Sequence, residues 1–256
     1  MAVTINLNDA NNDGVGIDLQ AYLTNFNTTF QRADYGYFST NPTDFSGNAY
    51  ATTNVDLALV TGNPSAWSFI ANSGASGDFT YDLLARQLNG TLDAVSFGHG
   101  LTYDAGSDSF SHMTQDISVS GLNLSGSGAG NAVHTLIYDL MNGNIAELES
   151  ELNSNDLVIN GSTGDDVLQS YAGDDILTGG AGDDVFRFDN LSGNDVITDL
   201  QPGDAIDIVW QGVTSFSDLI IDYASDAGNA IVSAAGVADT ITVEGFSSGL
   251  DDTYFV

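Results

Sequence analysis

The chain lacks cysteine and lysine, and both absences narrow what it can do. Without cysteine it forms no disulfide, no thiolate metal site and no cysteine nucleophile. Its 256 residues carry only three basic side chains, all arginine, against 35 acidic ones, so the formal net charge is −32. A field of that sign repels nucleic acid and anionic membrane surfaces. We therefore expect cationic ligands and no nucleic acid partner.

Signals for targeting and catalysis are also missing. The N-terminus has neither the basic start nor the apolar run of a cleaved signal peptide, and no run of about 18 apolar residues predicts membrane insertion. An H-E-x-x-H zinc protease motif is absent as well, and nothing else in the sequence supports an enzyme. Hydrophobic residues make up 42% of the chain, which is enough to build a globular core.

A nine-residue repeat runs without a gap over residues 161–187, as GSTGDDVLQ, SYAGDDILT and GGAGDDVFR. Glycine permits a tight turn, a carboxylate is the oxygen ligand that calcium prefers, and the apolar residue behind it belongs to an inward-facing strand. Two copies make one coil of a parallel β-roll, so alternate copies share an edge. The predicted calcium ligands are the glycines Gly164, Gly173 and Gly182, the aspartates Asp166, Asp175 and Asp184, and the preceding aspartates Asp165, Asp174 and Asp183.

A displaced fourth copy, GNDVI, starts at Gly193 and places Asp195 beside Asp175 on the second edge. Together with the acidic, aromatic end LDDTYFV, residues 156–256 resemble the calcium-binding and type I secretion region of the RTX (repeats-in-toxin) family. That resemblance implies a module that is exported by type I secretion machinery and folds on extracellular calcium. Mutual repulsion of the aspartates would keep the module unfolded at low calcium.

Residues 1–155 have a different pattern. Apolar residues at helical spacing predict a helix over 18–30, and two more helices follow in AVHTLIYDLM and NIAELESELN. Between about 44 and 125 come strand-like runs separated by Gly, Asn, Ser and Asp: NAYATT, DLALV, AWSFIA, DFTYDLL, TLDAVSFG and QDISVSGLNL. We expect an α+β domain, an antiparallel sheet with helices on one face, followed by the all-β parallel β-roll module.

Three smaller features of residues 1–155 are predicted to be structural. The acidic segment Asn8–Gln20 has part of the EF-hand spacing but ends in glutamine instead of glutamate, so we expect a turn. His99 and His112 are expected in separate surface loops.

IDLQAYLTNFNTTF, FSGNAY, DFTYDLL, GTLDAVSFGHGL, ISVSGLNL and VHTLIYDLMNGNIAELESELN occur in the order and spacing of HasA-type haemophores, so about residues 3–153 resemble that family. The resemblance implies a secreted carrier that holds ferric haem b between two loops and passes it to an outer-membrane receptor. It aligns Tyr81 with the family's iron-binding tyrosine and His134 with a family histidine near it. A phenolate is a sound ligand for ferric iron.

The first loop, QRADYGYFSTNPT, has no histidine at the family's second ligand position. Tyr35 stands there by counting, and Tyr37 is close enough to compete. Three alternatives remain open: ligation by Tyr81 alone, a second oxygen ligand from Tyr35 or Tyr37, or a domain that no longer binds haem. Arg32 and Arg86 lie in the two loops and are candidate partners of the haem propionates.

The sequence therefore predicts a secreted haem carrier with a calcium-folded export module. Its alternative is a calcium-dependent surface or matrix protein, involved in adhesion, whose haemophore-like domain has lost haem. Both are extracellular, and the second is associated with the cell surface.

Overall fold

A computed structural model of the chain describes residues 2–10, 12–39, 45–55, 63–75, 77–226 and 228–256. They form two compact units. The first, here called the sheet unit, comprises residues 21–151, and the second, here called the coil unit, combines residues 2–20 with residues 152–256. The sheet unit is thus an insertion in the sequence of the coil unit. The domain division predicted at residue 155 differs from these units chiefly in the placement of residues 2–20.

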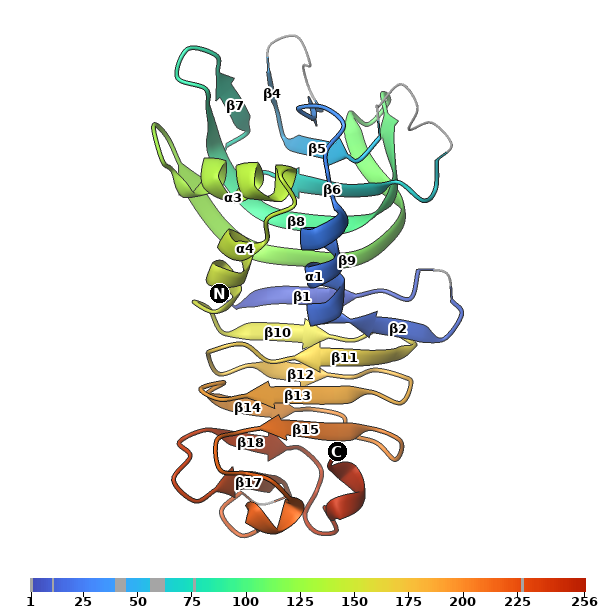
Figure 1. Cartoon of the computed structure of the whole chain (residues 1–256), viewed down its shortest axis with the longest axis vertical. Coiled ribbons are helices and arrows are strands. Elements are labelled where there is room, and N and C mark those ends of the chain that lie inside the picture. The colour runs from blue at the N-terminus through green and yellow to red at the C-terminus, as the bar shows by residue number, and fades with distance from the viewer. Residues whose placement is uncertain (1, 11, 40–44, 56–62, 76, 227) are drawn as a thin grey trace. The chain divides into compact units, whose positions relative to one another are not determined.

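The sheet unit contains an antiparallel sheet with the strand order β9-β8-β6-β5-β3, and the short strand β7 pairs with both β8 and β4 (Figure 1). The predicted strand DLALV at 56–60 lies outside the described residues. The strands are β3 (Tyr37–Phe38), β4 (Ser46–Gly47), β5 (Ala49–Thr53), β6 (Trp67–Asn72), β7 (Phe79–Asp82), β8 (Gln87–Asp104) and β9 (Ser109–Gly126).

The long hairpin of β8 and β9 corrects the prediction that His99 and His112 lie in loops, because both are strand residues. Gly98 and Gly100 resemble turn punctuation in the sequence. In the structure the ladder shifts register between Phe97 and Gly98, and a Cβ on Gly98 would lie 2.1 Å from the carbonyl oxygen of Thr114. Glycine here permits a bulge and a close approach of β9, and the strand continues through it.

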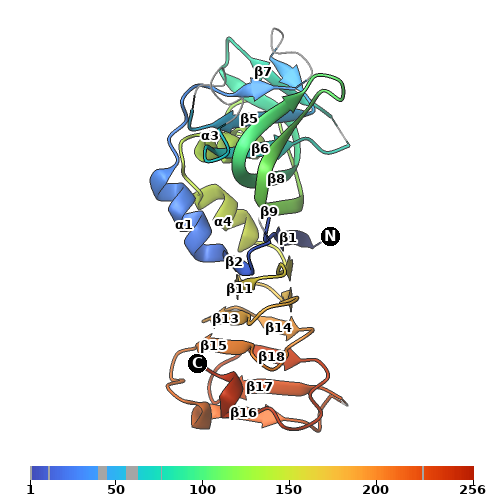
Figure 2. The same cartoon turned by 90° about the vertical axis from the view of Figure 1, so that its right-hand side faces the viewer.

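Three helices lie on one face of this sheet, as predicted (Figure 2). Helix α1 (Leu19–Thr29) buries Leu19, Leu23 and Phe26, one residue per turn. Helix α3 (Ala132–Met141) is capped at its N-terminus by Asn131, whose side chain accepts the His134 N–H at 2.9 Å. Helix α4 (Ala146–Leu152) follows after a short turn.

The coil unit consists mainly of parallel strand pairs. One series runs β1-β10-β12-β14-β18 and continues into antiparallel β17 and β16, and the other runs β2-β11-β13-β15. We call these two series together the coil stack. Its strands are β1 (Val3–Leu7), β2 (Val15–Asp18), β10 (Leu157–Asn160), β11 (Asp165–Gln169), β12 (Ile176–Thr178), β13 (Val185–Asp189), β14 (Asn194–Ile197), β15 (Ala205–Val209), β16 (Leu219–Asp222), β17 (Ala230–Ala234) and β18 (Thr240–Val243); short 3-10 turns occupy Phe216–Asp218 and Asp252–Tyr254.

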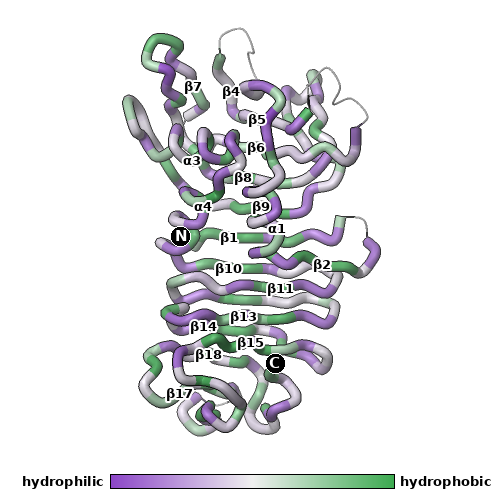
Figure 3. Tube along the Cα trace, in the orientation of Figure 1, coloured by the Kyte–Doolittle hydropathy of each residue, from purple (hydrophilic) through white to green (hydrophobic). Residues whose placement is uncertain are grey.

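The repeat sets the stacking of this unit. Residues 18 apart pair between β11 and β13, as the nine-residue period predicts, and the displaced copy lengthens the step to 20 residues. Leu168, Leu177 and Phe186, at the eighth positions, are completely buried, so the predicted inward-facing residue is confirmed. Figure 3 shows the apolar stretches along the strands and polar residues at the turns.

The N-terminal segment forms a further coil, although its sequence has no copy of the nine-residue repeat. Strand β1 pairs in parallel with β10, and β2 pairs in parallel with β11. In the turn between β1 and β2, the Asp9 carboxylate accepts the N–H groups of Asp13 (3.3 Å) and Gly14 (3.0 Å), which makes this segment the predicted structural turn. No helix among the described residues is long and apolar enough to cross a membrane.

Candidate functional site

Tyr81 lies on the short strand β7 of the sheet unit. Its N–H donates to the Phe45 carbonyl at 2.9 Å, and the two ring centroids are 6.4 Å apart. Across the ladder Tyr81 stands opposite Leu88 of β8. Phe79, two residues earlier on the same face, is fully buried, whereas Tyr81 is only half-buried. The strand thus holds the Tyr81 phenol at the rim of the core, where a ligand can reach it.

The turn between β7 and β8 presents apolar side chains to solvent. Leu83 is 61% exposed and Leu84 is 98% exposed. The Asp82 carboxylate fixes the turn by accepting the N–H groups of Leu84 (2.8 Å) and Ala85 (2.9 Å). Arg86 completes the turn at a φ of +54°, a left-handed conformation that is unfavourable for residues with a Cβ. Two leucines held outward beside Tyr81 form a surface that an apolar ligand can cover.

His134 lies in the first turn of α3. Its Nδ1 accepts the N–H of Leu88 at 3.1 Å, so the neutral ring carries its proton on Nε2. Burial lowers the pKa of His134 and favours that neutral form. The ring stacks on Tyr138 at 5.6 Å. Because Leu88 is the cross-strand partner of Tyr81, the predicted pair is connected through one strand ladder, with His134 available as a hydrogen-bond donor.

The first loop holds the predicted tyrosines in different ways. Tyr35 is 78% exposed, and the Arg32 guanidinium carbon lies 4.6 Å from its ring centroid, a cation–π contact. The Tyr37 hydroxyl donates to the Asp34 carboxylate. Residues 40–44 of this loop lie outside the described residues.

Tyr50 on β5 contacts the first loop, and the sequence points to it only as part of the FSGNAY segment. It is buried and its hydroxyl donates to the Tyr35 carbonyl. Burial raises the pKa of Tyr50 strongly, and the Arg32 guanidinium opposes that shift. Asp34, Tyr37 and Tyr81 add to the effect of burial. Five residues, from the first loop, β5 and β7, therefore share one electrostatic environment: Arg32, Asp34, Tyr37, Tyr50 and Tyr81.

In the coil unit, each Asp-Asp pair of the repeat bonds the neighbouring coil in a reciprocal way. Asp184 Oδ1 accepts the Asp166 N–H at 2.8 Å, and Asp165 Oδ1 accepts the Asp183 N–H at 2.8 Å. The sixth-position aspartates are buried, whereas Asp165 and Asp183 are exposed. The predicted neighbourhood of Asp166 and Asp184 is therefore correct, and their carboxylates cap backbone donors of the adjacent coil.

The second edge repeats this arrangement. Asp195 Oδ1 accepts the Asp175 N–H at 3.0 Å, and the exposed Asp174 accepts the Asn194 N–H at 2.9 Å. Asp175 in turn accepts the N–H of Leu157 at 2.8 Å. The displaced copy thus places Asp195 next to Asp175, as expected.

Burial makes these carboxylates unusual acids. It raises the pKa of Asp195 to about 8 and those of Asp175 and Asp184 to about 6. Asp195 Oδ2 is buried and accepts no hydrogen bond of good geometry among the described residues, and the neighbouring Ser192 hydroxyl is also unsatisfied. Within the described ranges no three acidic or histidine side chains converge on one point. A cation held here would therefore need main-chain carbonyl oxygens as well.

The repeat glycines serve two purposes. Gly173 (φ +138°) and Gly182 (φ +134°) adopt conformations that other residues avoid. Gly164 has no positive φ, but a Cβ on it would lie 2.6 Å from the main-chain nitrogen of Gly16. Gly164 therefore allows the N-terminal coil to pack closely, whereas the sequence predicts that it permits a tight turn.

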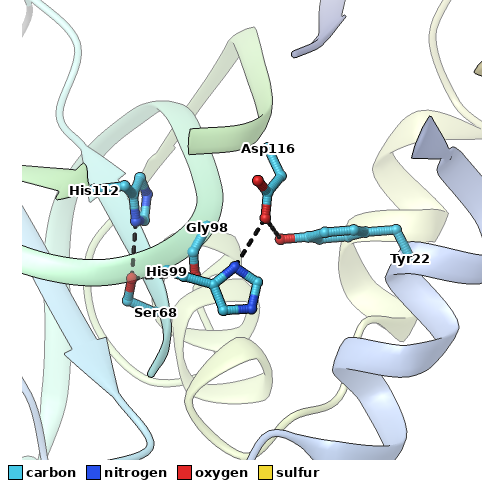
Figure 4. A network of polar contacts seen from close by, with 6 residues as sticks. All are labelled: Tyr22, Ser68, Gly98, His99, His112 and Asp116. Atoms are coloured by element: carbon cyan, nitrogen blue, oxygen red, sulfur yellow. Dashed lines mark hydrogen bonds and ion pairs between the residues drawn. The ribbon is translucent and has the colours of Figure 1, made fainter. Parts of the chain in front are cut away.

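A polar network lies in the sheet unit, apart from the predicted site (Figure 4). Asp116 Oδ2 accepts the Tyr22 hydroxyl at 2.8 Å and lies 3.0 Å from His99 Nδ1. The two ring nitrogens of His112 lie 2.8 Å from the Ser68 hydroxyl and 3.0 Å from that of Ser96. Burial lowers the pKa of His112 to about 4, so the ring is neutral near pH 7. His112 is a half-buried strand residue that bonds two serines, and not the loop histidine that was expected.

Comparison with known proteins identifies relatives of the chain. The family model described as Heme-binding protein A (HasA) matches residues 17–185, more than half of the chain. The hemophore HasA of Serratia marcescens is 35% identical over 151 residues, 54% of this chain and 74% of that protein. An apo structure of the hemophore HasA from Yersinia pestis is 25% identical over 60% of this chain and 87% of that chain, with a TM-score of 0.46. A holo structure of that hemophore has the same identity and TM-score and is covered to 89%.

Proposed function

Because the chain belongs to the HasA family of heme-binding proteins, we propose that it is a secreted carrier that binds ferric haem b beside Tyr81 and releases it chemically unchanged. Membership in a family of heme-binding proteins bears out the predicted resemblance to haemophores and the expectation that the chain is no enzyme. An outer-membrane haem receptor is its partner in uptake.

The observation that carries the proposal is the half-buried Tyr81 phenol next to the exposed leucines of the β7–β8 turn. Bound haem supplies a ferric ion that accepts an oxygen ligand, and Tyr81 is the residue placed to give it. Leu83 and Leu84 are placed to cover the porphyrin, which would remove their apolar surface from water. Arg32 and Arg86 are the basic residues of the two loops and would pair with the propionates.

His134 supports the tyrosinate as a donor. Since its Nδ1 already accepts the Leu88 N–H, its Nε2–H is the group left to donate a hydrogen bond toward an ionised phenol. Such a bond favours the charged form of Tyr81. Tyr35 is the better second ligand of the two candidates, because the Tyr37 hydroxyl already donates to Asp34.

Haemin titration tests the proposal. Mixing haemin with the full chain should shift its Soret band, and Tyr81→Phe should weaken binding by at least about tenfold because an iron ligand is lost. Tyr254→Phe, a matched change in the coil unit, should leave binding unchanged. If the absorbance of free haemin is unaltered by the wild-type chain, the surface or matrix role replaces the carrier.

For residues 156–256 we propose a calcium-binding β-roll that carries the signal for type I secretion. Support comes from the parallel strand pairs and from buried aspartates that are costly to ionise. A divalent cation near Asp195 would satisfy its orphaned Oδ2 and offset the cost of burying its charge. Main-chain oxygens at the turns of Gly164, Gly173 and Gly182 would complete such sites. Chelation of calcium should then reduce the strand signal in circular dichroism, and calcium should restore it; an unchanged spectrum contradicts the roll.

A further inference from the structure

Helix α1 begins inside the coil unit and leads to the first loop of the sheet unit. Strand β2 ends at Asp18, and α1 starts at the next residue without a linker. The helix ends at Thr29, and the loop with Arg32 and Tyr35 follows. The first turn of α1 thus precedes, along one continuous helix, the segment that carries the candidate haem contacts.

Two sets of contacts within the coil unit fix this start. Strand β2 pairs with β11, and the Ile17 N–H donates to the carboxylate of Asp166. A Cβ on Gly16 would lie 2.5 Å from the carbonyl carbon of Asp165, so this pairing admits only glycine there. The second contact reaches the helix itself, because the Tyr171 hydroxyl donates to Gln20 Oε1 at 3.3 Å.

Tyr171 is itself held by the repeat. It is 8% exposed, and its N–H donates to Asp175 Oδ2 at 2.9 Å. A continuous series of contacts thus runs from a buried repeat aspartate through Tyr171 to Gln20 in the first turn of α1. The nine-residue motif does not require a tyrosine at this position, since the other two copies have Ser162 and Gly180 there.

We propose that Tyr171 is a positioning residue that ties the start of α1 to the coil stack and so slows the loss of haem from the loop after the helix. The part that concerns haem rests on the proposed function. The link itself concerns only residues of this chain and exists without haem.

Hydrogen exchange of the full, haem-free chain tests the link. Tyr171→Phe keeps the ring and removes the hydroxyl, and it should speed exchange in the first turns of α1 by about fivefold, as expected for one lost neutral hydrogen bond. Gln20→Leu should speed exchange to the same extent, and combining it with Tyr171→Phe should add nothing further. Gln20→Glu should exchange as slowly as wild type, because it keeps an acceptor oxygen. Tyr223→Phe is the control, because its hydroxyl bonds Leu250 in the same unit.

A second measurement follows haem transfer from each loaded variant to excess apomyoglobin. Tyr171→Phe should release haem several-fold faster than wild type, and Tyr223→Phe should not. Equal exchange in α1 for Tyr171→Phe and Tyr223→Phe overturns the link, and so does faster exchange spread evenly over β10–β14, which marks a general loss of stability. Equal haem release overturns its role in retention. If wild type binds no haemin, the proposed function fails while the exchange result still decides the link.

Discussion

The coil unit takes three of its buried aspartates from one short repeat, whereas the sheet unit assembles its candidate site from three separate segments. In the coil unit Asp184, Asp195 and Asp204 each accept the N–H of the corresponding aspartate one coil earlier. In the sheet unit, Tyr35, Tyr81 and His134 come from a loop, a strand and a helix. The bond between coils is kept whether the spacing is 18 or 20 residues. The candidate site instead depends on where each of its three segments places its side chain.

The largest expected effect separates the stabilities of the two units. Phe186 is fully buried in the coil unit, so Phe186→Ala should destabilise that unit by about 3–5 kcal/mol. Denaturant unfolding followed by hydrogen exchange should show the loss in residues 157–243 and leave β8 and β9 protected. Leu191→Ala, at a side chain that is 78% exposed, is the control and should change little. A loss shared equally by both units would show that they unfold as one.

The next largest effect is a difference in stability between variants of the two aspartates of one pair. Asp175→Ala leaves the N–H groups of Leu157 and Tyr171 without their acceptor, at a cost of about 1–3 kcal/mol for each buried donor. Asp174→Ala removes only an exposed acceptor and should cost much less. Urea midpoints of the two variants measure the difference. Equal midpoints would mean that the buried carboxylate does not hold the coils together.

Much of the coil unit could be predicted because each nine residues specify turn, carboxylate and strand together. The pairing of residues 2–20 could not be predicted, because this segment lacks the repeat and its partners lie up to 154 positions away in the sequence. In the sheet unit, helical spacing predicts all three helices, but the prediction that His99 and His112 lie in loops is wrong because β8 and β9 continue through them. For the candidate site the sequence predicts Tyr81, and its role in binding haem stays a prediction. The role of Tyr50 and the exposure of Leu84 depend on tertiary packing and turn geometry, which no local pattern encodes.

The buried aspartates should make the stability of the coil unit depend on pH. The pKa values of Asp175 and Asp184 rise to about 6 and that of Asp195 to about 8 on folding, from an ordinary value near 4. The folded state therefore binds more protons than the unfolded state between pH 4 and pH 8. Without divalent cation, the free energy of unfolding of the coil unit should fall as pH rises through this range.

Calcium should flatten that fall, because a bound cation stabilises the ionised carboxylates. Thermal unfolding at pH 5, 6.5 and 8, with chelator or with calcium, measures both trends. The Asp195→Asn variant keeps the shape without the charge and should lose most of the pH dependence above pH 6. A coil unit that grows more stable with rising pH in chelator would contradict the burial of these acids.

The smallest expected effect concerns the second iron ligand and sharpens the account of the sheet unit. Tyr35 is exposed and stacked with Arg32, whereas Tyr37 is bonded to Asp34, so Tyr35→Phe should change the visible spectrum of the haem-loaded chain and Tyr37→Phe should not. The change should be a shift of the charge-transfer bands with only a modest loss of affinity, because Tyr81 remains bound. Identical spectra for wild type and both variants would assign ligation to Tyr81 alone. A change confined to Tyr37→Phe would mean that the bond to Asp34 activates that phenol for the iron instead of engaging it elsewhere.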